Sequence, residues 1–326
     1  MKNSNTNATT DSNDQAGTQL ELYIAEQIIR DVPAKDDLTS MEYPLFSLSK
    51  KPDMRIRDYS RGGKTIRIIP SGVGAANVFD KDILVYATTV LINASNIGLK
   101  PSRRIRIDVH DFLLATKRST GGASYERILQ ALRRLRGTTI ETNIKTTEEE
   151  RTRGFSMITD YEITKETKNR KGALEIEVTI AEWLYRQIAQ YEVLTINDAY
   201  YGLTQGIERR LYQLARKHAG DKPIWKIGVK LLQEKCGSRQ LSKFFMNELR
   251  EIVEKDNLPD YKLLIDDEGS NPMAVFLTRD SRRLLVELNR TNSMGWYGNL
   301  LKKTTERKER LRKNAAAKAA KAETSE

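Results

Sequence analysis

Residues 119–164 read STGGASYERILQALRRLRGTTIETNIKTTEEERTRGFSMITDYEIT and place a basic helical segment directly before two strand-like segments. Gly121 and Gly122 precede the helical pattern, and a small polar residue such as Ser124 can cap its first N–H groups. Apolar residues then recur at helical spacing from Ile128 to Leu135, and Gly137 stands where a helix ends. We therefore expect an amphipathic helix that starts near residue 123 or 124.

The segment after this helix has the pattern of a β-hairpin. β-Branched residues alternate in 138–144 and again in 155–163, and the turn between them is charged. A basic helix followed by a hairpin is the order of a winged helix-turn-helix, in which the helix enters the major groove and the hairpin reaches the backbone or minor groove. An amphipathic helix packed on a sheet with a solvated charged face explains the same pattern, so both interpretations stay open.

The expected helix carries its polar side chains opposite its apolar face. Arginine suits guanine or phosphate, and glutamine suits adenine. The candidate DNA-binding residues here are Ser124, Arg127, Gln130, Arg133 and Arg134.

The flanking segments complete an order of helix, strand, helix, helix, strand and strand. A long helix is expected over 80–97, a short strand over 104–107, and a helix capped by Asp108 after it. The alternating segment 173–180 is expected to close this first domain. A short helix at 182–190 and a strand near 191–196 then bridge the two halves.

The same order returns roughly a hundred residues later. Helices are expected at 203–218, 229–235 and 240–255, with strands at 223–227, 261–265 and 274–278. In the third helix Leu241, Phe245, Leu249 and Ile252 are expected to face inward. The outward candidates for DNA binding are Arg239, Gln240, Lys243, Asn247 and Arg250. Of these, Asn247 suits adenine, and Lys243 and Arg250 suit phosphate.

The sequence thus predicts an α+β fold with two tandem winged helix-turn-helix domains and disordered N- and C-terminal tails. The expected boundaries are a flexible arm at 1–52, domains at 53–196 and 197–290, and a basic tail at 291–326. Such modules could contact successive major grooves of a duplex, about 34 Å apart.

A basic hairpin is expected just before the first domain's long helix. Apolar and basic residues alternate in 55–70 around a Gly62-Gly63 turn, which makes Arg61 and Lys64 candidate phosphate contacts or simply residues of a solvated strand face. Gly62-Gly63-Lys64-Thr65 ends like a phosphate loop. However, Asp58 stands where that motif needs glycine, so an ATP site is rejected.

Composition favours an anionic partner and offers little for chemistry. The 326 residues carry 55 Lys and Arg against 44 Asp and Glu, a net charge of +11, which favours nucleic acid. We expect no membrane span and, with one cysteine, an intracellular location without disulfides. The two histidines have no partner at metal-ligand spacing, so we expect no metal, no cofactor, no catalytic residues and no enzymatic activity.

The entry segment MRIRDYSRGGKTIRIIPSGVGAANVFDKDILVYA and the segment RILQALRRLRGTTIETNI, together with the tandem order of elements, resemble the plasmid replication initiator protein A family over 53–280. The resemblance implies a bacterial cytoplasmic protein that binds repeated double-stranded sites (iterons) in a plasmid origin and opens an adjacent AT-rich region. It also implies recruitment of the host initiator and replicative helicase, and a monomer–dimer equilibrium in which the homodimer represses its own promoter.

Three other functions remain open at this point. A DNA-binding transcriptional (auto)repressor without initiator activity could share every residue named above. A nicking enzyme of rolling-circle replication would need a metal-binding histidine pair before a tyrosine, which the sequence lacks. A partition or scaffold protein would use DNA only as a track and would bind with weak sequence selectivity.

Overall fold

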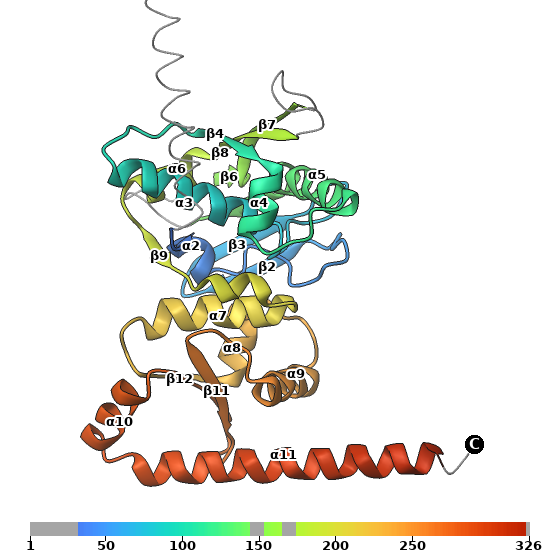
Figure 1. Ribbon diagram of the computed structural model, residues 1–326, viewed down its shortest axis with the longest axis vertical. Coiled ribbons are helices and arrows are strands. Elements are labelled where there is room, and N and C mark those ends of the chain that lie inside the picture. The colour runs from blue at the N-terminus through green and yellow to red at the C-terminus, as the bar shows by residue number, and fades with distance from the viewer. Residues whose placement is uncertain (1–31, 144–152, 165–173, 324–326) are drawn as a thin grey trace, which may run out of the picture. The chain divides into compact units, whose positions relative to one another are not determined.

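The computed structural model describes residues 32–143, 153–164 and 174–323. The expected helix at 19–30 lies outside these residues. So does the expected hairpin turn at 145–154, except for its last two residues, which begin a strand. The chain divides into two compact units, residues 1–202 and 203–326, which are described separately here (Figure 1).

Unit 1 mixes short strands with helices. In chain order its elements are β1 (Lys35–Asp37), α2 (Leu38–Glu42), β2 (Arg57–Arg61), β3 (Lys64–Ile69), α3 (Asp82–Asn96), β4 (Arg104–Asp108), α4 (Val109–Ala115), α5 (Gly122–Gly137), β5 (Thr139–Thr142), β6 (Arg153–Phe155), β7 (Ile158–Thr164), β8 (Glu175–Ile180), α6 (Glu182–Ala189), β9 (Val193–Thr195) and the 3₁₀ turn η2 (Asp198–Gly202).

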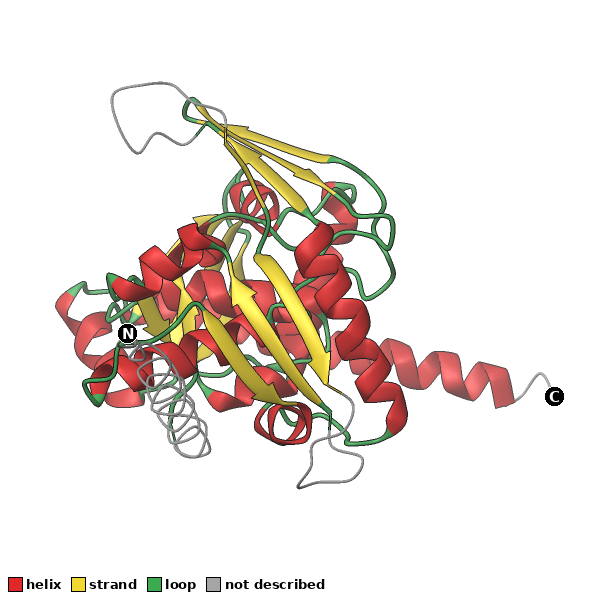
Figure 2. Cartoon of the chain, turned by 90° about the horizontal axis from the view of Figure 1, so that it is seen from above, coloured by secondary structure: helices red, strands yellow, loops and turns green. Residues whose placement is uncertain are grey.

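Two antiparallel sheets and the buried helix α3 form the body of unit 1. One sheet has the order β2-β3-β5-β6 and the other the order β4-β8-β7, while β1 pairs with β9. The strands of these sheets are yellow in Figure 2. Every residue of α3 from Asp82 to Ala94 is buried, so this helix is covered on all sides even though it includes the polar residues Asp82 and Asn93.

The expected hairpin between 138–144 and 155–163 forms only in part. Strands β5 and β6 pair with Ile140 opposite Phe155, but the rest of the second segment belongs to the other sheet. Strand β5 pairs with β3 and β6, whereas β7 pairs with β8. The chain crosses between the sheets at Ser156 and Met157. There the Ser156 carbonyl accepts from the Trp183 indole at 3.0 Å, and the Met157 amide donates to the Leu135 carbonyl at 3.3 Å. These bonds replace the strand ladder at the crossing point.

Residues 32–52 fold into unit 1, which corrects the expectation of a flexible arm throughout 1–52. Leu45 and Phe46 join the core of the unit. Asp36 of β1 and Lys81, just before α3, form an ion pair at 2.7 Å with both side chains at most 1% exposed. Burial raises the pKa of Asp36 to about 6 even though the Lys81 ammonium opposes this shift.

Unit 2 has a simpler order. Its elements are α7 (Gly206–Ala219), β10 (Ile224–Gly228), α8 (Val229–Cys236), α9 (Ser242–Lys255), β11 (Tyr261–Asp266), β12 (Met273–Thr278), α10 (Ser281–Arg290) and α11 (Met294–Glu323).

The sheet of unit 2 has the order β10-β12-β11 and is antiparallel throughout. Helix α8 ends at Gly237, whose φ of 72° is the left-handed conformation that glycine adopts at low cost. The core side chains Phe245 and Leu249 of α9 and Phe276 of β12 are fully buried. Helix, strand, helix, helix and two strands therefore follow one another as the sequence predicts for this half.

The expected disordered tail is wrong for residues 294–323, which form the single long helix α11 (Figure 1). Its first part packs on unit 2. Leu300 is buried, and the Trp296 indole donates to the Asp266 carboxylate at 2.8 Å. The Lys226 ammonium lies 3.5 Å from the centroid of the Trp296 ring, which adds a cation–π contact.

Candidate nucleic-acid interface

Helix α5 presents a mixed polar face to solvent. Arg127 and Arg133 are exposed, and Gln130 is half-buried beside them. The Gln130 amide donates to the Glu126 carboxylate at 2.8 Å, and the Arg133 guanidinium lies 4.0 Å from the same carboxylate. The face therefore keeps its cations but also carries one acidic group, which would oppose an approaching phosphate.

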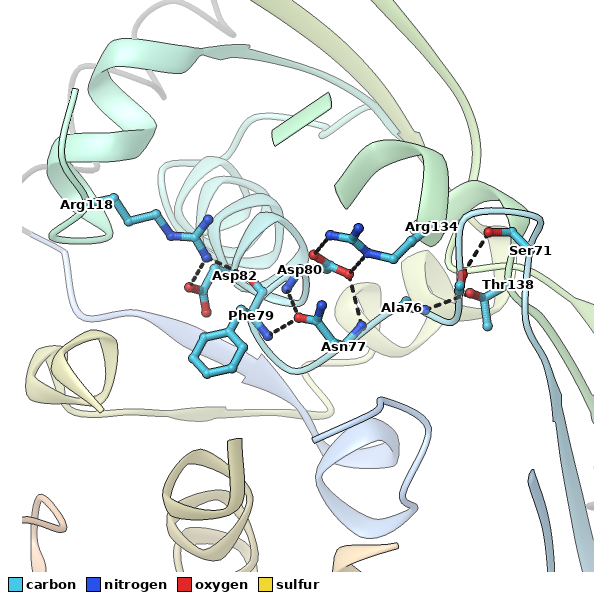
Figure 3. A network of polar contacts seen from close by, with 10 residues as sticks. Ser71, Ala76, Asn77, Phe79, Asp80, Asp82, Arg118, Arg134 and Thr138 are labelled. Atoms are coloured by element: carbon cyan, nitrogen blue, oxygen red, sulfur yellow. Dashed lines mark hydrogen bonds and ion pairs between the residues drawn. The ribbon is translucent and has the colours of Figure 1, made fainter. Parts of the chain in front are cut away.

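Arg134 does not belong to this outward face, so its predicted base contact is wrong. Its Nε and Nη2 atoms donate to the two oxygens of Asp80, each at 2.7 Å, and its side chain is 14% exposed (Figure 3). The hydrogen bonds that Arg134 donates to Asp80 raise the pKa of its guanidinium. Such a bidentate pair fixes geometry as well as charge, so Arg134 anchors α5 within the unit.

The segment 71–82 connects α5 to α3 through further polar contacts (Figure 3). The Ala76 amide donates to Thr138 Oγ1 at 2.8 Å, and the Asn77 amide donates to Asp80 at 2.9 Å. Arg118 donates to Asp82 at 2.6 Å. Residues 71–77, which superficially resemble part of a dinucleotide fingerprint, thus form a structural connection between helices.

The same connection explains Gly137, and burial of Ser124 separately excludes that residue from DNA contact. A Cβ atom at residue 137 would lie 2.5 Å from the Cβ of Ser71, so only glycine allows this approach. Ser124 is buried inside the first turn of α5, where its hydroxyl lies 3.0 Å from that of Ser119. The prediction that Ser124 faces DNA is therefore wrong.

Helix α9 is anchored mainly by apolar side chains. Phe245, Leu249 and Ile252 are buried at helical spacing, as the sequence predicts. Leu241 is the exception, because it is exposed at the residue before the helix. Its carbonyl accepts hydrogen bonds from the amides of Phe244 and Phe245 at the start of α9.

The outward face of α9 keeps three of the five residues predicted for it. Arg239, Lys243 and Asn247 are exposed. The Gln240 amide instead donates to Glu248 at 2.6 Å, which ties the segment before α9 to the helix itself. Phe244, which the sequence pattern did not single out, is exposed between Lys243 and Asn247. It is exposed because only one of two adjacent helical residues can face the core, and Phe245 takes that position.

Arg250 lines a cavity of about 410 Å³ that α9, β11 and α11 share. Its guanidinium lies 3.8 Å from Asp267, and Arg307 of α11 is on the same cavity. Burial, followed by the neighbouring Arg250, lowers the pKa of Arg307. Glu254, Asp267 and Glu306 also line the cavity, so its charges largely offset one another. Arg250 therefore faces α11 and is less accessible to DNA than Lys243 or Asn247.

The β2–β3 hairpin forms as predicted. Arg61 pairs with Lys64 across a turn in which Gly62 and Gly63 have φ values of 54° and 76°. Positive φ at both turn residues is the geometry of a tight hairpin turn. Arg61 and Lys64 are exposed at the tip, and the Lys64 ammonium donates to the Tyr43 hydroxyl at 3.4 Å.

The described residues also bring Asp108, His110 and Asp111 together at the start of α4. The Asp108 carboxylate accepts from the Asp111 amide at 2.9 Å and serves as the helix cap. This cap accounts for the arrangement without a metal ion. Within the described part of the chain, no helix is both long and apolar enough to cross a membrane.

Comparison with known proteins places these observations in a family. The family described as "Replication initiator protein A" matches residues 35–263, more than half of the chain. A "Putative replication protein" of Wigglesworthia glossinidia brevipalpis is 39% identical over 247 residues, which cover 74% of this chain and 88% of that protein. The solved structure of domains 2 and 3 of RctB superposes with a TM-score of 0.53 at 12% identity, covering 74% of this chain and 96% of that one, and shows a similar fold. The chain belongs to the replication initiator protein A family.

Proposed function

We propose that this protein is a plasmid replication initiator that binds repeated double-stranded DNA sites in its origin through two winged helix-turn-helix modules. Membership of the replication initiator protein A family supports the role in starting replication. The observation that supports two modules is the repeated sheet order. Each unit contains a three-stranded sheet in which the strand that comes first in the chain pairs with the strand that comes last. The order is β4-β8-β7 in unit 1 and β10-β12-β11 in unit 2.

The proposed modules place one helix of each unit in the position of a recognition helix. In unit 2, α8 and α9 precede the β11–β12 wing. In unit 1, α4 and α5 precede the β7–β8 wing, with β5 and β6 inserted between helix and wing. Recognition helices of this class contact base edges from the major groove.

The exposed side chains suggest how the roles divide. Arg127 on α5 suits guanine, and Asn247 on α9 suits adenine, each bidentate contact being worth about 1–3 kcal/mol of discrimination. Gln130 and Arg133 would add contacts on the α5 side, and Arg239 and Lys243 on the α9 side. Arg61 and Lys64 at the hairpin tip would hold the phosphate backbone, which raises affinity without reading sequence.

We further propose that the protein acts by binding alone, without catalytic residues, metal or cofactor. The two histidines have structural positions that support this: His110 is at the start of α4, and His218 stacks on Trp225 with ring centroids 5.0 Å apart. Bound at its repeats in the bacterial cytoplasm, the protein would open the adjacent AT-rich DNA and recruit the host initiator and replicative helicase. A homodimer in equilibrium with the monomer would repress its own promoter.

A nuclease footprint on the DNA that flanks this gene in its native replicon tests the proposal. At physiological salt with competitor DNA, we expect discrete protection of direct repeats. Permanganate probing of the supercoiled replicon should then reveal unpaired thymines beside those repeats only when the protein is present. Arg127→Ala and Asn247→Ala should weaken protection, whereas Arg282→Ala, which removes an exposed cation of α10, should leave it unchanged.

Other footprints would give different answers. Protection of an inverted repeat over the promoter alone, with no unpaired thymines, would indicate an autorepressor without initiator activity. Uniform coverage that disappears with salt and has no discrete boundary would mean that neither helix reads sequence, and the proposal would fail.

A further inference from the structure

Two large apolar side chains lie exposed at the start of α9. Leu241 is 64% exposed and Phe244 is 51% exposed. They flank the first turn of the helix, and the Lys243 ammonium lies 4.9 Å from the centroid of the Phe244 ring. The two residues are three apart in the chain, so they lie near each other at one helix start, and exposed apolar groups rimmed by polar residues can mark an interaction site.

The groups around this pair define the partner that could cover it. Arg239, Lys243 and Asn247 are exposed on the same turn and the next one. Glu248, the carboxylate four residues after Phe244, accepts from the Gln240 amide and is half-buried. A cationic and amide rim around an apolar centre is complementary to a surface that is anionic at its edges and carries apolar groups inside it.

The major groove of a duplex that contains thymine has this character. Its edges are phosphates, and thymine is the base that presents a methyl group at C5 within the groove. The first residues of a recognition helix are those that contact base edges. We infer that Phe244 and Leu241 recognise thymine methyl groups in the DNA site of unit 2, next to the base read by Asn247.

This inference rests on the proposed function and extends it to base composition. The half-site that α9 contacts should contain one or two thymines whose methyl groups the pair covers. Burial of one methyl-sized group is worth about 0.8 kcal/mol, which corresponds to about a fourfold change in affinity. Two such contacts should together give about a tenfold change or slightly more.

Replacement of thymine by deoxyuridine tests the inference, because it removes only the methyl group. Fluorescence anisotropy would measure binding to a footprinted repeat and to duplexes with deoxyuridine at each thymine in turn. For the full-length wild-type protein, we expect about fourfold weaker binding at one or two positions and no change elsewhere. Phe244→Ala and Leu241→Ala should weaken binding to the thymine duplex and abolish the difference at one position each.

Two further variants separate methyl recognition from effects on folding. Phe244→Leu keeps an apolar group and should retain most of the difference between thymine and deoxyuridine. Leu285→Ala shortens a 48% exposed leucine of α10 in the same unit and should change neither affinity nor the difference. Thermal unfolding of each variant confirms that the protein remains folded.

The possible failures are distinguishable. A wild-type protein that binds its repeat specifically but equally well with deoxyuridine at every position would overturn the inference and leave the proposed function standing. The inference would also be overturned if sedimentation showed a wild-type dimer that Phe244→Ala dissociates while DNA binding stays unchanged. Phe244 and Leu241 would then belong to a self-association surface. A wild-type protein that binds no discrete site overturns the inference together with the proposed function.

Discussion

Helices α5 and α9 are each the second of two helices that follow the first strand of a three-stranded sheet, yet they are anchored differently. In α5, Arg134 turns inward and pairs with Asp80, which comes from the segment before α3. In α9, the anchoring side chains are apolar, with Phe245 at their centre. An arginine that the helical periodicity places on the outward face can therefore anchor a helix as readily as it can contact a ligand.

The outward faces differ as well. The face of α5 combines Arg127, Gln130 and Arg133 with the carboxylate of Glu126. The first turns of α9 combine Lys243 and Asn247 with the apolar ring of Phe244. If both helices enter DNA grooves, they should therefore prefer different bases.

The largest expected effect on the free energy of unfolding comes from one of the two adjacent phenylalanines of α9. Phe245 is fully buried, so Phe245→Ala should lower the free energy of unfolding by about 3–5 kcal/mol. Phe244→Ala removes a half-exposed ring and should change it by less than about 1 kcal/mol. Urea unfolding measures both, and similar losses for the two variants would contradict the placement of α9.

Arg134 and Arg127 of α5 form a second matched pair, with a somewhat smaller expected effect on the free energy of unfolding. Arg134→Ala leaves Asp80 buried without its partner and should cost about 3 kcal/mol of unfolding free energy. Arg127→Ala should cost less than about 0.5 kcal/mol. Adding Asp80→Asn to Arg134→Ala should recover part of the loss, whereas simply additive losses would show that the pair does not anchor α5.

The smallest effect concerns the carboxylate on the outward face of α5. Glu126→Gln removes a negative charge beside Arg133 while the residue can still bond to Gln130. Affinity for duplex DNA should rise a few-fold at low salt, since Coulomb repulsion of phosphate is relieved, and the gain should shrink as salt is added. Asp221→Asn, an exposed carboxylate between α7 and β10, is the control; an equal gain there would mean that only net charge matters.

Local signals in the sequence were enough to predict most of the elements. The cap at Asp108, the left-handed Gly237 and the Gly62-Gly63 turn all act within a few residues, so each can be recognised from its immediate neighbours. The periodicity of α9 likewise predicts the burial of Phe245, Leu249 and Ile252, although it misses Val253.

Contacts between distant residues explain the predictions that failed. Asp80 lies 54 residues before Arg134, so nothing near Arg134 indicates its partner. The crossing at Met157 depends on the Leu135 carbonyl at the end of α5, and β5 pairs with β3, which lies much earlier in the chain. The helix α11 has little sequence periodicity, and its position depends on single anchors such as Trp296.

A base-pair substitution scan would show whether the two helix faces read different parts of one DNA site. Every base pair of a footprinted repeat would be changed in turn and its affinity measured for wild type, Arg127→Ala and Asn247→Ala. We predict two blocks of sensitive positions about one helical turn apart, with Arg127→Ala relaxing one block and Asn247→Ala the other. A single block, or two blocks that both variants leave unchanged, would contradict the account.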